Sequence, residues 1–266
     1  DPAIVDPSAY FQPTLYAGNG TAIGSGGLEV NQSENSTFQP DFVWIKNRSA
    51  ADNHMLYDSV RGATKDLHSN AAAAEVTDTE GLSTFDTDGF TVGSNVEVNT
   101  NAENYVAWQW YAPTTSTNTD GSVSSTLSVS QTSGFSIGTF DGTGATLTAG
   151  HGLGVAPDFI MATVRPNAAN WNVYHSAIGN AGALRLNLNN AVSTTAQYWN
   201  NTSPTSTVIT FGTNGSSNSS GNSTIFYAFT EVEGFSKFGS YVGNANANGP
   251  MINLGFKPAW VMIKQA

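Results

Sequence analysis

One pattern of residues occurs three times along this chain, and it constrains the fold more strongly than any other feature of the sequence. Each copy begins with an aromatic residue before a glycine-containing turn and continues, after a loop, with a Pro-led apolar run. The first element occupies residues 16–20, 140–144 and 241–245, and the second occupies residues 40–46, 157–163 and 258–264. Self-similarity of this kind is typical of a repeat architecture.

Further residues recur in the same order between the first two copies. These matches are Tyr57-Asp58-Ser59 with Tyr174-His175-Ser176, Leu67 with Leu184, and Tyr105–Trp108 with Phe226–Phe229. We therefore expect a tandem repeat. Its segments are a first β repeat at 1–112, a Ser/Thr-rich connector at 113–133, a second β repeat at 134–234, and the incomplete opening part of a third at 235–266.

The copies read as β-strands. Residues 42–45 form a continuous apolar run of aromatic and β-branched residues, which favours a central strand buried on both faces. Apolar and polar residues alternate over 171–175, the period of two that a strand requires. The sequence thus predicts an all-β protein built from tandem β-sandwich or jelly-roll-like repeats of about seven to nine short strands each.

The two joints between the copies differ. The connector 113–133 is nearly all Thr, Ser, Asn and Gly, and it reads equally well as a flexible linker or as an added strand that turns back into Phe135. The third copy stops at Ala266, soon after its second element. We expect that the polypeptide continues beyond Ala266, or that residues 235–266 complete a fold with another chain.

Composition excludes several classes of protein. Nine Lys and Arg against twenty Asp and Glu give a net charge of −11, so the chain lacks the basic stripe that binds nucleic acid. The chain has no Cys, which excludes disulfides and thiolate metal sites. No apolar run approaches the roughly 18 residues of a membrane span, so we expect no membrane insertion. Only 11% of the residues are charged, and neutral Ser, Thr and Asn provide the polar surface.

Candidates for catalysis and metal binding are weak. His175 lies in an alternating strand without an ordered nucleophile and acid around it. Residues 86–89 (Asp-Thr-Asp-Gly) resemble the start of a calcium loop, but an Asp-capped turn explains them more simply. A pair of acids for glycoside cleavage would have to come from Asp58, Glu75, Asp86 or Glu103. Of these four, Asp58 alone lies in a repeated strand motif, and its counterpart is His175. We therefore expect no catalytic residue, no cofactor and no metal, and a protein that is not an enzyme.

Three aromatic residues are candidates for stacking on sugars at the surface: Trp110, Tyr198 and Trp199. A flat ring offers apolar area to the C–H faces of a sugar at a low entropic cost. The alternative, which we favour, places these rings in the core or at contacts between repeats.

Long strings of the sequence resemble a known repeat domain. They are Phe38–Ser49, Tyr57–Gly62, Phe85–Phe90, 134–179, Phe235–Tyr241 and Gly255–Lys264. They look like a repeat domain of unknown function that is common in virion structural proteins of tailed phages, especially marine and cyanobacterial ones. The resemblance covers nearly the whole chain, and it carries no catalytic residues to transfer. The second copy departs from the pattern at residues 162–164.

This resemblance implies a virion protein, outside the cell on the phage particle. The leading expectation is a tail fibre or adhesin segment that contributes to host attachment, self-associates as a homotrimer, contacts other virion proteins and binds host surface glycans. A capsid decoration or head-fibre protein is the alternative. A carbohydrate-active depolymerase and a cellular surface-layer or pilus-like adhesin are weaker candidates.

Overall fold

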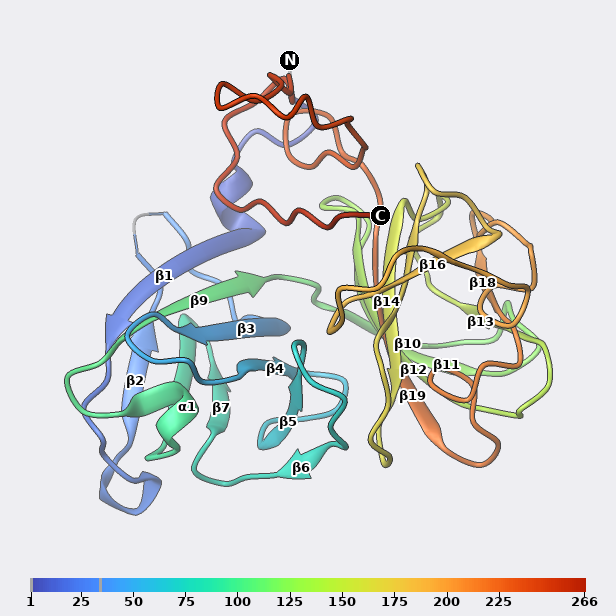
Figure 1. The fold of residues 1–266 in the computed structure, drawn as a ribbon. Helices are drawn as coiled ribbons and strands as arrows, with labels where there is room; N and C mark the ends of the chain where they lie inside the picture. The colour runs from blue at the N-terminus through green and yellow to red at the C-terminus, as the bar shows by residue number, and fades with distance from the viewer. Residues whose placement is uncertain (1, 34) are drawn as a thin grey trace.

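The computed structural model describes residues 2–33 and 35–266, and it is an almost entirely β structure (Figure 1). All strands pair antiparallel within four sheets, apart from one isolated parallel bridge. The helical elements within the described residues are one short α-helix, α1 (Val96–Asn99), and two single-turn 3-10 helices at Pro7–Ala9 and Ile23–Ser25. The predicted all-β, sandwich-like fold is confirmed.

Residues 11–110, here called the first unit, form two facing sheets. The six-stranded sheet has the order β1 (Phe11–Ala17), β9 (Asn104–Trp110), β3 (Phe42–Asn47), β4 (His54–Asp58), β5 (Lys65–His68) and β6 (Val76–Thr77). The three-stranded sheet has the order β2 (Leu28–Asn31), β8 (Gly89–Val92) and β7 (Leu82–Asp86).

Residues 114–229, the second unit, also form a large and a small sheet. The eight-stranded sheet has the order β10 (Thr114–Asn118), β11 (Ser125–Ser130), β12 (Phe135–Asp141), β19 (Ser223–Phe229), β14 (Phe159–Val164), β15 (Asn172–His175), β16 (Gly182–Arg185) and β17 (Ser193–Thr194). The two-stranded sheet pairs β13 (Leu147–Gly150) with β18 (Val208–Phe211). Of the two alternatives for the connector, the structure has the added strand, because β11 pairs with β12 and β10 extends the sheet beyond it.

The large sheets of the two units share a strand order. In each, an opening strand (β1 or β12) pairs with a closing strand (β9 or β19), which pairs on its other side with the Pro-led strand (β3 or β14). Phe42 stands opposite Trp110, and Phe159 stands opposite Phe229. Trp110 is therefore the counterpart of Phe229, whereas the sequence match gave Trp108. The match was wrong by two residues, a shift that leaves every side chain on the same face of its strand.

Three apolar clusters lie between the sheets. One fills the first unit and contains Val43 and Ile45, and another fills the second unit around Ile160. The third lies between the units and includes Phe42 and Trp44, whose side chains are on the face of β3 opposite to Val43 and Ile45. Residues 42–45 are buried on both faces, as their composition predicts, because the first unit's large sheet is covered on one side by its small sheet and on the other by the second unit.

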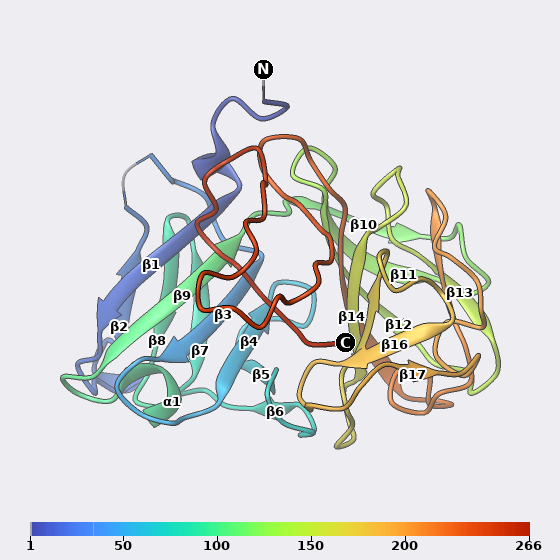
Figure 2. The same cartoon turned by 45° about the horizontal axis from the view of Figure 1, so that its top comes forward.

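Residues 231–266, here called the C-terminal segment, are all described and form no strand beyond an isolated bridge between Val232 and Ser236. The segment is the red loop that runs across the molecule between the two units in Figure 2. Its apolar side chains are largely in solvent: Val242 is 89% exposed, Met251 93% and Ile263 68%. Among the described residues, no helix is long and apolar enough to cross a membrane.

Candidate functional site

Aromatic rings join the two units face to face. The ring of Phe42 lies 4.4 Å from that of Tyr227 and 5.9 Å from that of Phe135, measured between centroids. Trp110 lies 6.2 Å from Phe135 and 6.3 Å from Phe229. Corresponding faces of the two large sheets meet, since β3 and β14 both turn their Phe residue into this cluster. Large apolar contact of this kind fixes the units as one body.

A buried polar cluster crosses the same interface. Arg61 Nε donates to Asp58 Oδ2 at 2.5 Å, and both side chains are 0% exposed. The hydroxyl of Tyr227, from the second unit, donates to the same oxygen at 2.6 Å. The burial of Tyr227 and the charge of Asp58 raise the pKa of this phenol despite the neighbouring guanidinium. Such pairs are costly to break, because removing one partner leaves a buried charge without compensation.

Glu75 extends the cluster to the edge of the interface. It accepts from Arg61 Nη1 at 3.2 Å and from Arg165 of the second unit at 2.8 and 2.9 Å. Its main-chain N–H also donates to the carbonyl of Arg165. Burial alone would raise the pKa of Glu75, but the hydrogen bonds from Arg165 and the charge of Arg61 outweigh it and hold the pKa below its usual value.

Two buried asparagines, which sequence reasoning missed, hold corresponding turns. Asn99 Oδ1 accepts the N–H of Asn19 at 2.7 Å, and Asn218 Oδ1 accepts the N–H of Thr143 at 2.8 Å. Both asparagines are 0% exposed. They occupy corresponding positions ahead of β9 and β19 once Trp110 is placed with Phe229, so the sequence match that was wrong by two residues concealed them.

The Asp of the Pro-Asp-Phe motif has one structural role in both units. Asp41 Oδ2 accepts the N–H of Ala112 at 2.7 Å, and Asp158 Oδ2 accepts the N–H of Glu231 at 2.9 Å. Each carboxylate thereby ties the start of the Pro-led strand to the end of the closing strand. The corresponding residue in the C-terminal segment is Ala259, which has no carboxylate.

The C-terminal segment lies on the tryptophan-rich face of the first unit. The ring of Trp260 is 5.7 Å from that of Trp110 and 6.1 Å from that of Trp44. Trp44 Nε1 donates to His54 Nδ1 at 3.0 Å. A shallow hollow of about 390 Å³ remains there, lined by Trp44, His54, Trp108 and residues 259–263.

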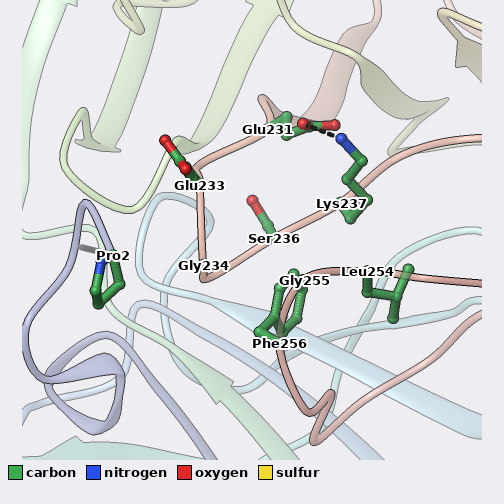
Figure 3. Close-up of a pocket in the computed structure, with 9 residues that line it drawn as sticks. All are labelled: Pro2, Glu231, Glu233, Gly234, Ser236, Lys237, Leu254, Gly255 and Phe256. Atoms are coloured by element: carbon green, nitrogen blue, oxygen red, sulfur yellow. Dashed lines mark hydrogen bonds and ion pairs between the residues drawn. The ribbon is translucent and has the colours of Figure 1, made fainter.

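A second hollow, of about 740 Å³, opens between two stretches of the C-terminal segment. Residues 231–237 line one side and residues 254–256 the other, with Pro2 at the rim (Figure 3). An ion pair joins Lys237 Nζ to Glu231 Oε1 at 2.5 Å across the first stretch. The segment is therefore spread apart at this point rather than packed on itself.

The three aromatics proposed for sugar stacking lie inside the protein. Trp199 is 1% exposed and Tyr198 6%, both within the core of the second unit, and Trp110 is 7% exposed in the cluster between the units. The structure therefore has the favoured alternative, in which these rings lie in the core or between the units, and it leaves none of the three on the surface for stacking on a sugar. Large aromatic rings bury more apolar area than most side chains, and all three of these rings are packed in apolar clusters.

The weak candidates for chemistry lie apart from one another. His175 packs against the rings of Phe159 and Phe238, and Asp86 accepts from the hydroxyl of Thr91 in the β7–β8 hairpin. Asp58 belongs to the buried interface cluster. Within residues 2–33 and 35–266, no group of three His, Cys, Asp or Glu side chains is placed to hold a metal ion.

Both units and the C-terminal segment fall within a single match to one protein family. Residues 6–266 match the family described as Domain of unknown function (DUF7483). The chain belongs to this family. In this DUF7483 protein the match includes residues 231–266, so the C-terminal segment is part of the family's domain. No curated protein and no solved structure matches the chain significantly.

Proposed function

We propose that this chain is a structural protein of a bacteriophage virion, a tail fibre or adhesin segment that contributes to attachment to the host surface. The resemblance of its motifs to virion repeat domains supports the proposal. The observation that carries it is the exposure of apolar side chains in the C-terminal segment. Met251 and Ile263 are among those that stay in solvent, whereas the aromatic rings of the two units are buried or half-buried.

The two units are, in this proposal, copies of one β repeat. Their large sheets share the order of opening, closing and Pro-led strands. The pair Asn99 and Asn218 and the pair Asp41 and Asp158 make corresponding hydrogen bonds in both. Packing repeats through their large faces builds a stiff body, which suits a fibre that transmits force and presents loops outward.

Self-association completes the proposal. Covering the large apolar residues that a monomer exposes on one segment lowers the free energy of the assembly. Fibres are commonly closed homo-oligomers. We propose a homotrimer in contact with other virion proteins, with host surface glycans as the target.

Immunogold electron microscopy of the phage that encodes this chain tests the assignment. Antibody raised against the chain should label tail fibres, and the purified chain should block adsorption to host cells. Label on the head would instead support a capsid decoration or head-fibre protein. Particles without label would overturn the virion assignment, and release of reducing sugar from host polysaccharide would replace it with a depolymerase.

A further inference from the structure

Three rings of the first unit form a row on the face of its large sheet that is turned away from the small sheet. Trp44 of β3 stands directly opposite Trp108 of β9. His54 of β4 stands opposite Lys46, two residues from Trp44, and so lies on the same face as Trp44. The rings of Trp108 and His54 lie 6.2 and 6.0 Å from that of Trp44 and are inclined to it at 89° and 74°. The row therefore forms a corner of steeply inclined rings instead of a flat layer.

The second unit has the same row, but there the first unit covers it. The corresponding residues, in the order of Trp44, Trp108 and His54, are Met161, Tyr227 and Trp171. Their exposed fractions are 1%, 0% and 1%. In the first unit Trp44 is 7% exposed, whereas Trp108 and His54 are only half-buried. The two large sheets thus pack off centre, and their contact leaves part of the first unit's row accessible.

The hollow of about 390 Å³ lies over this accessible part of the row. Trp44, His54 and Trp108 form one side of it. Residues 259–263 form the other side, where the ring of Trp260 lies 6.1 Å from that of Trp44. The volume is within the range of small-molecule sites. Because the hollow is shallow, it suits a ligand that stays partly in solvent, such as one residue of a longer chain.

Hydrogen-bond donors line the hollow. An indole N–H only donates, so the 3.0 Å hydrogen bond from Trp44 Nε1 to His54 Nδ1 requires a neutral His54 to carry its proton on Nε2. Burial, together with the nearby charge of Lys46, lowers the pKa of His54 and keeps the ring neutral at pH 7. His54 Nε2 and the indole N–H groups of Trp108 and Trp260 donate to no group within residues 2–33 and 35–266.

This chemistry fits an uncharged sugar better than other ligands. Ring faces offer apolar area to sugar C–H groups, and ring N–H groups match sugar oxygens. A purely apolar ligand would leave these donors without acceptors. A phosphate or uronate would find no cation, because the described residues that line the hollow include no Lys or Arg. A proline-rich peptide requires an extended aromatic groove, whereas these rings surround one compact hollow.

We propose that this hollow binds one uncharged sugar residue of a host surface glycan. Trp108 and Trp260 contact the faces of the sugar, and His54 Nε2 donates to one of its oxygens. Trp44 is a positioning residue, because its hydrogen bond fixes the His54 tautomer. The inference gives the proposed attachment function a binding site and a class of sugar, and it rests on that function.

Indole N–H signals in nuclear magnetic resonance spectra test the site. The probes are the methyl glycosides of glucose, galactose, mannose and N-acetylglucosamine at millimolar concentration. The signals of Trp108 and Trp260, identified by their loss in Ala variants, should shift with at least one probe. Those of Trp171 and Trp199, each 1% exposed, should not move. Absence of a shift with every probe, or equal shifts of all indole signals, would overturn the proposal.

A matched pair of variants separates binding from folding. Trp260→Ala should weaken binding of the probe at least about tenfold and leave the melting temperature nearly unchanged, because its ring is partly exposed. Tyr241→Ala removes a ring of the same segment that is 47% exposed and lies outside the hollow, so binding should not change. Equal binding by these two variants would overturn the site.

His54→Phe keeps an aromatic ring but has no N–H to donate. It should weaken binding of the probe at least about tenfold, because a sugar oxygen loses its donor. Wild-type affinity in a folded His54→Phe variant would contradict the assigned donor.

Further titrations distinguish other occupants. Larger shifts of the Trp108 signal with methyl glucuronide than with methyl glucoside would overturn the preference for an uncharged sugar. Larger shifts with a polyproline peptide would make the hollow a peptide site and overturn the glycan. In the polypeptide at its natural length, a Trp108 indole that is protected from exchange and insensitive to every probe would assign the hollow to the chain itself.

The outcome is separable from that of the virion assignment. Sugars that fail to bind, with tails still labelled by antibody, would remove only this inference. Unlabelled particles with a hollow that binds sugar would remove only the virion assignment.

Discussion

Residues 159–164 and residues 260–265 have similar patterns and opposite structures. The first stretch is β14, with all six residues buried at the centre of a sheet. The second is irregular, with Val261 and Ile263 in solvent. The difference is the neighbour: β14 has the closing strand β19 beside it, and the C-terminal segment has none. An apolar β-prone run is thus necessary for a central strand but becomes one only when a partner satisfies its backbone.

Removing that neighbour from the second unit should reproduce the irregular state there. Ile225→Pro places Pro in the middle of β19, opposite Thr139 of β12 and Thr163 of β14. We expect a loss of at least about 3 kcal/mol of unfolding free energy. Amides of β12 and β14 should then exchange as fast as those of residues 235–266, measured by hydrogen–deuterium exchange.

The control for this variant is Ser116→Pro in β10, an exposed strand at the edge of the same sheet, which should cost far less. Continued protection of β12 and β14 in Ile225→Pro would show that the closing strand does not determine their order.

Replacing the aromatic residue at corresponding positions should cost much more stability in the first unit than in the C-terminal segment. Phe42→Ala removes a fully buried ring from the interface between the units and should cost about 3–5 kcal/mol. Trp260→Ala, at the matching position of the C-terminal segment, should cost under about 1 kcal/mol, because its ring remains partly exposed. Chemical denaturation of both variants measures this contrast, and equal costs would contradict it.

The turn-holding asparagines test whether the two units are alike. Asn99→Ala and Asn218→Ala should each cost about 1–3 kcal/mol, since each leaves buried main-chain N–H groups without an acceptor. Asn244→Ala, in the matching turn of the C-terminal segment, should change stability by less than about 0.5 kcal/mol because that turn is exposed. A large effect of Asn244→Ala in thermal unfolding would contradict the contrast.

The smallest expected effect is a pH-dependent change in stability at Asp66, a position where the two units differ. Burial raises the pKa of Asp66 to about 6, and the corresponding residue in the second unit is Ala183. In the unfolded chain this carboxyl has its ordinary pKa near 3.9, so the folded state bears the cost of ionisation in full above pH 6. Asp66→Ala should therefore stabilise the chain by about 1 kcal/mol at pH 7, after the lost packing is subtracted.

This gain should shrink as the pH falls from 6 and become a net loss of stability below about pH 4, where the carboxyl is protonated in both states and only the lost packing remains. Denaturation of wild-type chain and Asp66→Ala across this range measures the difference. A difference that did not change with pH would show that Asp66 is not held in a raised-pKa environment.

Residue types and their spacing predicted the β class, the burial of residues 42–45 on both faces and the added strand as one reading of the connector. They did not predict the register of the closing strands. The closing strands were matched two residues out of place because a strand's period of two makes such a shift invisible. For Trp110, Tyr198 and Trp199 the sequence left a surface role open beside the favoured burial, because a ring that stacks on sugar and a ring that fills a core are the same residue types.

By itself, the sequence determined strand propensity, turn positions and the order of the recurring elements, since these depend on neighbouring residues. Only the tertiary structure decided which strand lies between which. It alone brought Arg61 and Tyr227 together across the interface and left Val261 and Ile263 uncovered. The physical reason is that a strand's main-chain hydrogen bonds and both of its faces are satisfied by residues distant in the chain, which no local pattern specifies.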